Sequence, residues 1–83
     1  MKIYIVVANC RNFSTTELDT TLKVFKTQEE AEKQLKDWYQ EDLDTAGTGL
    51  LEAEKWENGY YVTYSDIANG ECEINADIYV EEV

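Results

Sequence analysis

Histidine and proline are absent from this chain of 83 residues, and cysteine occurs only twice. Without histidine, the chain lacks the side chain that most often serves as a general base or metal ligand near neutral pH. Cys10 and Cys72 form no CxxC spacing and are too few for a disulfide framework, so we expect both to be free thiols. Cys72 is expected to pack as a small hydrophobic residue. These absences argue against an enzyme, a cofactor or a metal site.

Long apolar runs are also missing, since no stretch approaches the ~18–20 residues that a membrane helix needs. The first ten residues hold one lysine and a short apolar run without a small-residue cleavage site, which predicts a strand and not a signal peptide. With 43% hydrophobic residues, the chain is too apolar for a disordered acidic tail. We expect one domain over residues 1–83 and a cytoplasmic location.

Basic residues are scarce in the second half of the chain. Residues 1–40 carry six acids and six bases, whereas residues 41–83 carry twelve acids and one base, Lys55. The whole net charge of −11 therefore arises in the second half. A surface this negative repels nucleic acid and anionic membranes and attracts basic proteins, so the expected partner is a protein.

The first half predicts two strands and a helix. Residues 2–8 are rich in β-branched and aromatic side chains, which predicts a central strand buried on both faces. After a polar loop over residues 9–16, residues 20–25 should pair with it. Thr27 and Glu30 form a capping-box pattern at the start of a helix over residues 28–42. Its apolar stripe consists of Ala31, Leu35, Trp38, Tyr39 and Leu43.

The second half predicts strands and turns. After a flexible link over residues 44–49, the alternation in residues 50–56 favours a strand over a helix. Asn58-Gly59 marks a turn into a strand over residues 60–64, and Asn69-Gly70 marks another turn into residues 71–81. The expected fold is α+β, with a single helix packed on a mainly antiparallel sheet of four or five strands in the order ββαβββ.

The length of the second turn decides which tyrosines enter the core. A two-residue loop pairs Tyr61 with Ile78. A three-residue loop over residues 68–70, with a left-handed glycine, pairs Tyr60 with Ile78 and Val62 with Ala76. We favour the second register, because it turns Tyr60, Val62 and Tyr64 toward the core.

The last strand alternates between an apolar face and an acidic face. Alternate residues lie roughly 6.6–6.8 Å apart, a repeat that resembles the phosphate spacing of a nucleic-acid strand. The candidate partner-binding residues on this strand are Glu71, Glu73, Asp77 and Glu81. Supporting charges are Glu52, Glu54, Glu57, Glu41, Asp42 and Asp44, and Tyr61, Tyr79 and Trp56 are candidate exposed aromatics. The alternative is a face that is acidic only for solubility.

A calcium site at Glu41, Asp42 and Asp44 is a weaker hypothesis, since the calcium-loop pattern with its distal glutamate is missing. A small regulatory domain that self-associates through a sheet edge or its aromatics, as a homodimer, is the second functional hypothesis.

In outline, the chain resembles small acidic proteins of phages and mobile elements. The likeness rests on an opening M-K-x-Y-x-V strand, a helix start with the pattern F-x-T-x-E-E-A from Phe25 to Ala31, and a closing acidic strand over residues 78–83. Such proteins include anti-CRISPR proteins and restriction inhibitors that mimic DNA. The resemblance implies a non-enzymatic inhibitor that occupies the basic nucleic-acid-binding surface of a host defence nuclease.

Overall fold

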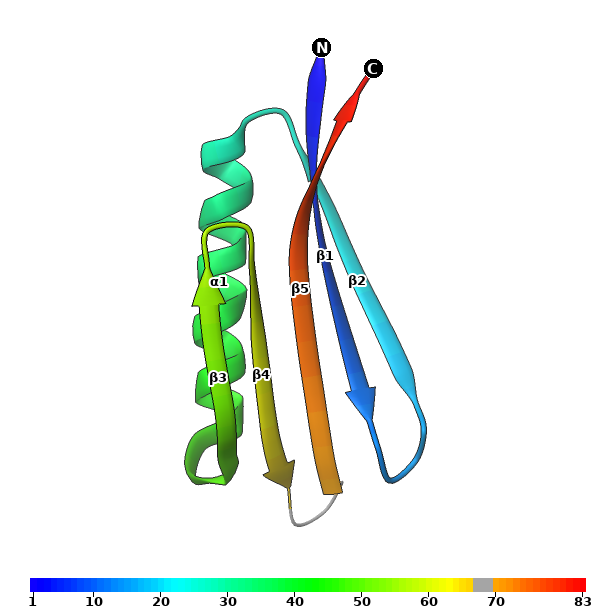
Figure 1. Cartoon of the computed structure of the whole chain (residues 1–83), viewed down its shortest axis with the longest axis vertical. Coiled ribbons are helices and arrows are strands. Elements are labelled where there is room, and N and C mark those ends of the chain that lie inside the picture. Colours follow the sequence, from blue (N-terminus) through cyan, green and yellow to red (C-terminus); the bar gives the residue numbers. More distant parts are fainter. Residues whose placement is uncertain (67–69) are drawn as a thin grey trace.

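The computed structural model describes residues 1–66 and 70–83 (Figure 1). One long helix lies against one face of an antiparallel sheet, which confirms the α+β class. In the described part of the chain the sheet has five strands in the spatial order β2-β1-β5-β4-β3. The elements are β1 (Lys2–Asn12), β2 (Leu18–Phe25), α1 (Gln28–Ala46), the 3₁₀ turn η1 (Gly47–Gly49), β3 (Leu50–Trp56), β4 (Gly59–Asp66) and β5 (Gly70–Glu82).

The longest pairing joins the first strand to the last. β1 and β5 pair from Lys2 opposite Glu82 to Asn12 opposite Cys72. The chain termini therefore lie together, and the amino group of Met1 donates to the carbonyl oxygen of Val83 at 3.1 Å (Figure 1). The expected loop over residues 9–16 is wrong at its start, because residues 9–12 continue the ladder with β5. Pairing with a distant strand outweighs the polar character of these residues.

The helix begins where the capping pattern predicts. The Thr27 side chain accepts a hydrogen bond from the Glu30 amide at 3.3 Å and donates to the Glu30 carboxylate at 2.9 Å. The helix runs past the expected end, because Ala46 is buried and holds the last turn against the sheet. Gly47 then closes the helix with a φ of 52° and a hydrogen bond to the Leu43 carbonyl. The expected flexible link over residues 44–49 is therefore wrong.

The core lies between α1 and the sheet. Its buried residues are Val6, Ala31, Leu35, Tyr60, Val62, Ile74 and Ala76. The expected helix stripe is confirmed, since Ala31 and Leu35 are fully buried and the three larger members pack around them. The rings of Tyr39 and Tyr60 meet at 5.3 Å between centroids and are tilted by 58°, a favourable aromatic geometry.

The register between β4 and β5 differs from the expected one. Tyr60 lies opposite Ala76 and Val62 opposite Ile74, so the predicted pairing is wrong by two residues. The expected loop falls mostly on residues outside the described part of the chain. Gly70 has the expected left-handed backbone, with a φ of 80°. A shift of two residues keeps every side chain on its predicted face, so the core tyrosines point toward α1 as expected.

The face of the sheet away from α1 is uncovered. The expectation that the first strand is buried on both faces is wrong, because Ile3, Ile5 and Val7 are only half-buried. Residues 1–66 and 70–83 contain one α-helix, and that helix packs on the opposite face (Figure 1). We call the uncovered side, with the strand residues that point away from α1, the open face.

Candidate functional site: the open face of the sheet

Alternation along β5 decides what the open face presents. Cys72, Ile74 and Ala76 point toward α1 and are buried. Their neighbours therefore point the other way. The β5 residues on the open face are Glu71, Glu73, Asn75, Asp77, Tyr79 and Glu81. Because β5 is the middle strand of the sheet, this row runs along the centre of the open face.

Two glutamates of β3 lie on the same face. The pairing sets Glu73 on β5 opposite Thr63 on β4, and Thr63 opposite Glu52 on β3. Glu54 lies opposite Tyr61 in the same way. Glu73 and Glu52 are thus two strand spacings apart, ~10 Å between backbones. Residues 21 positions apart in the chain are brought together by the meander of β3, β4 and β5.

Six carboxylates lie on this part of the open face, and we call the surface that they form the acidic half. Its members are Glu52, Glu54, Glu71, Glu73, Asp77 and Glu81. Among the strand residues that the structure describes, Arg11 is the one base on the open face, and it lies opposite Glu73. Lys23 instead points toward α1, where its ammonium donates to Gln34 at 3.3 Å. Lys33, on α1, pairs with Asp37.

The charges of the acidic half act on Tyr61, which lies among them. Partial burial of Tyr61, followed by the negative charges of Glu73 and Glu52, raises the pKa of its phenol. Asn75 donates a hydrogen bond to Glu73 at 2.9 Å, which holds that carboxylate in place. A shallow hollow of ≈ 400 Å³ lies between Glu52, Glu71 and Glu73 and has Phe13, Leu51, Tyr61 and Thr63 in its walls. The acidic half thus offers negative charge around a shallow hollow that also presents aromatic and aliphatic side chains.

Aromatic side chains border the acidic half. Trp56 is 46% exposed and Tyr79 is 54% exposed, as predicted, whereas Tyr61 is half-buried. Gly59 makes room beside them, because a Cβ there would lie 2.5 Å from the Ala76 carbonyl oxygen and 2.9 Å from the Trp56 indole nitrogen. Exposed aromatics at a charged surface are the usual anchors of a protein interface.

Four of the predicted supporting charges lie elsewhere. Glu41, Asp42 and Asp44 are on α1, in the other layer of the molecule, so they form no second row beside β5. Glu57 lies in the turn between β3 and β4, where it lines a hollow together with Lys55 and the first half of α1, on the helix side of the sheet. The sequence placed Glu41 and Asp42 at the end of the expected helix, but it did not show on which side of the sheet that helix packs.

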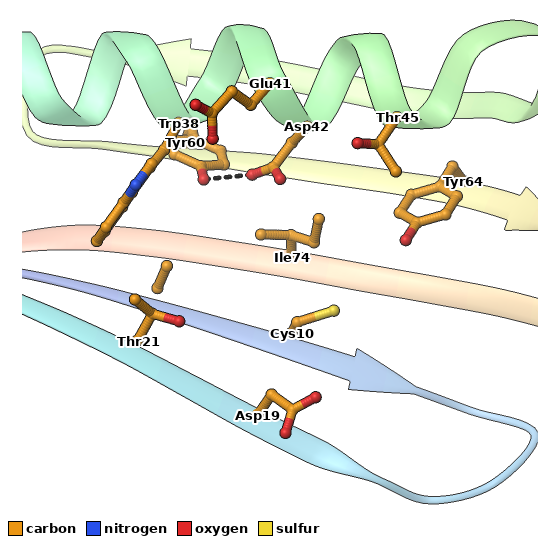
Figure 2. A pocket seen from close by; sticks show the side chains of 11 residues that line it. Cys10, Asp19, Thr21, Trp38, Glu41, Asp42, Thr45, Tyr60, Tyr64 and Ile74 are labelled. Carbon is orange, nitrogen blue, oxygen red and sulfur yellow. Dashed lines mark hydrogen bonds between the residues drawn. The ribbon is translucent and has the colours of Figure 1, made fainter.

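A second concave site lies in the helix layer and was missed by sequence reasoning. A cavity of ≈ 280 Å³ separates α1 from β1 and β2, with Asp19, Glu41, Asp42 and Cys10 around it (Figure 2). The hydroxyl of Tyr60 donates a hydrogen bond to Asp42. Burial raises the pKa of Asp42, although this hydrogen bond opposes the shift. Burial, and then the Asp42 contact, raises the pKa of Tyr60.

The Cys10 thiol and the phenols of Tyr60 and Tyr64 around this cavity are held in their neutral forms. Burial is the main cause that raises the pKa of Cys10, and the charges of Asp42 and Asp19 add to it. Burial and a hydrogen bond with Cys72 raise the pKa of Tyr64 to about 12. A nucleophilic cysteine needs the opposite shift. The described residues around the cavity include no lysine, arginine or histidine that would stabilise a thiolate.

The open face also has an apolar half, which lies over β1 and β2 and reaches Tyr79 on β5. Its residues are Ile3, Ile5, Val7, Leu22, Val24 and Tyr79. Leu22 and Val24 are each more than half exposed. In the sequence, this surface is indicated only by the apolar residues on both faces of the first strand. We interpreted that pattern as a strand buried on both faces.

No group of three His, Cys, Asp or Glu residues within the described parts of the chain is arranged to hold a metal ion. None of the helical segments described is long and apolar enough to cross a membrane. Comparison of the chain with protein-family models, with curated proteins and with solved structures found no match.

Proposed function

We propose that this protein is a non-enzymatic inhibitor whose acidic half binds the basic nucleic-acid-binding surface of a defence nuclease. The observation that carries the proposal is the gathering of six carboxylates on one sheet face, where the described strand residues supply one base, Arg11. An ordinary solvated face mixes both signs of charge. Here most of the bases lie on α1 or on the helix side of the strands, so the negative field of the open face is little compensated.

The geometry favours a partner that grips phosphates. Along β5, Glu71 and Glu73 are about 6.8 Å apart, and the strand row is fixed by pairing on both sides. Carboxylates on paired strands are pre-organised, so binding loses little conformational entropy at the backbone. A channel lined with lysine and arginine would meet them as it meets a phosphate backbone. Trp56 and Tyr79 would add apolar contacts at the border.

The sequence resemblance to phage and mobile-element inhibitors supports the same role. Under this proposal, the protein acts in the host cytoplasm as an anti-CRISPR-like or DNA-mimic inhibitor. It needs no cofactor, and it blocks the partner by occupying the channel. Binding should weaken as salt rises, because the contacts are between exposed charges.

The test compares charge reversals on the two layers. The immobilised wild-type protein, the pair Glu73→Lys with Asp77→Lys, and the pair Glu29→Lys with Glu32→Lys are each exposed to a bacterial lysate. The two pairs change the net charge equally, one on the open face and one on α1. We expect the wild type to retain a basic nucleic-acid-binding protein that excess DNA duplex displaces.

The retained protein is then purified and its affinity measured against all three chains. Reversal on the open face should weaken binding roughly tenfold or more, while reversal on the helix should change it by less than about threefold. Cleavage of DNA by the retained nuclease should be inhibited by the wild type and by the helix variant. Equal small effects of both pairs, or retention that DNA does not compete with, would contradict the proposal.

A further inference from the structure

The two edges of the sheet differ in how well they are protected. β3 has a bulge between Leu50 and Glu52 and carries Glu52, Glu54 and Lys55. Bulges and charges are the usual devices that stop an edge strand from pairing with another chain. β2 has no bulge in its pairing with β1, and every residue from Leu18 to Val24 is exposed. β2 is thus the unprotected edge.

The hydrogen-bonding groups of β2 point outward at alternate residues. The Asn12 amide donates to the Glu17 carbonyl oxygen at 2.9 Å, so this pair is a hydrogen-bonded one. Hydrogen-bonded and non-hydrogen-bonded pairs alternate along an antiparallel ladder. Asp19, Thr21 and Lys23 therefore bond to β1. The residues that direct their amide and carbonyl groups toward the open edge are Leu18, Thr20, Leu22 and Val24.

The charge pattern of β2 is self-complementary, so that two antiparallel copies of the strand attract each other. Asp19 and Lys23 are its two charged residues, they have opposite signs, and they lie symmetrically on either side of Thr21. Both point toward the α1 side of the sheet. Two copies of this strand, antiparallel and centred on Thr21, would set each Asp19 opposite the other copy's Lys23. Opposite charges directly across an antiparallel pair stabilise it.

We propose that β2 pairs with β2 of a second copy of this chain, antiparallel and centred on Thr21, so that one sheet runs through both protomers. In this register, Leu18 lies opposite the partner's Val24, and Thr20 lies opposite the partner's Leu22. All four outward-pointing residues of each strand then gain hydrogen-bonded partners. The apolar half of the open face becomes continuous across the junction.

The distribution of charge favours a second copy at this edge. Residues 1–40, which include β2, carry equal numbers of acids and bases. The acidic half lies over β5 and β3, on the far side of β1 from the junction. Pairing through β2 therefore keeps the two acidic halves apart, whereas pairing through β3 would bring them together. The helix leaves β2 largely uncovered, so two helices on one side would not meet (Figure 1).

Sedimentation of the full chain tests the proposal. The monomer has a mass of 9.6 kDa, and we expect the wild type to sediment at twice that mass. Asp19→Lys sets lysine against the partner's Lys23, and it should raise the dimer Kd roughly 10–100-fold, since two attractive pairs become repulsive. The double variant Asp19→Lys with Lys23→Asp restores opposite charges and should recover most of the affinity.

Control variants distinguish a specific effect at the β2 edge from a general effect of net charge. Glu29→Lys makes the same charge change on α1 and should leave the dimer Kd unchanged. Leu22→Pro removes an amide that points outward, so it should abolish the dimer while circular dichroism stays like that of the wild type. A wild type that is monomeric at its highest soluble concentration would overturn the proposal. So would a dimer that neither Asp19→Lys nor Leu22→Pro weakens, or β2 pairing with another protein only.

These variants leave the acidic half intact. If the β2 variants lose dimerisation but still inhibit the nuclease, dimerisation and inhibition are separate properties. If the wild type forms the dimer but does not inhibit a nuclease, the proposed function is refuted and the β2 pairing stands.

Discussion

The face of the sheet toward α1 and the open face are built by alternate residues of the same strands, yet they differ in burial and in charge. On the helix side, Val6, Tyr60 and Val62 are almost fully buried. On the open side, the same strands present half-buried aliphatic residues at one edge and carboxylates toward the other. One face therefore supplies stability, and the other is free to supply recognition.

The largest expected difference between the faces is in the cost of truncating a leucine. Leu35→Ala empties part of the helix–sheet core and should lower the free energy of unfolding by about 2.5–5 kcal/mol. Leu51, which lines the open-face hollow and is 58% exposed, is the matched control. Leu51→Ala should cost less than about 1 kcal/mol. Urea denaturation measures both, and equal losses would mean that the open face is also covered.

The next largest effect is expected from loss of the hydrogen bond between Tyr60 and Asp42, which links β4 to α1. Tyr60→Phe leaves a partly buried carboxylate without its donor, and should lower the free energy of unfolding by about 1–3 kcal/mol. Tyr79→Phe makes the same chemical change at an exposed position of the open face. It should alter stability by less than about 0.5 kcal/mol. A larger effect at Tyr79 would reverse the assignment of the stabilising face.

A smaller effect concerns the charge of Asp42. Because burial raises its pKa above the ordinary value of 3.8, the folded state binds the proton more tightly than the unfolded state does. The stability that Asp42 contributes is thus present below pH 3.8 and is lost as pH rises through the raised pKa. Asp42→Asn cannot ionise and can still accept from Tyr60.

The stability of Asp42→Asn relative to wild type should therefore increase through this pH window and level off above it. Denaturation at a series of pH values measures the difference. Asp44→Asn removes a carboxylate on the exposed side of α1 and is the control variant. A constant difference between Asp42→Asn and wild type at every pH would contradict the buried position of Asp42.

The smallest effect lies on the open face. Glu73→Gln removes a negative charge beside Tyr61 and should lower the pKa of that phenol toward its ordinary value. NMR titration of tyrosine labelled at the ring carbon that bears the hydroxyl resolves the individual phenols. Glu29→Gln on α1 should leave the Tyr61 titration unchanged. If both variants moved it equally, the field at Tyr61 would reflect net charge and not the acidic half.

Local patterns predicted most of the elements. Thr27 and Glu30 marked the start of the helix, and the stripe from Ala31 to Leu43 gave its buried side. The alternation of β5 gave the two faces of that strand. These features depend on residues close together in the chain, where helix and strand periods fix which side chains share a face. The row Glu71, Glu73, Asp77 and Glu81 followed from the same alternation.

The predictions from sequence were wrong where segments distant in the chain contact each other. The helix extends to Ala46 because the sheet buries that residue, and β1 extends to Asn12 because β5 pairs with it. The β4–β5 register moved by two residues because every even shift keeps the same faces and so satisfies the hydrophobic pattern equally. The apolar residues on the second face of β1 were interpreted as buried, since the sequence does not say how many layers cover a sheet.

The amino-acid sequence by itself determined the α+β class, the helix stripe, the alternation of β5 and the separation of charge between the two halves of the chain. Those properties follow from short-range periodicity and composition. Only the tertiary structure decided that β3 joins β5 in one acidic surface, that the helical acids lie in the other layer, and that β2 is an unprotected edge. The order of strands in a sheet is set by packing and pairing over long chain distances, which no local pattern records.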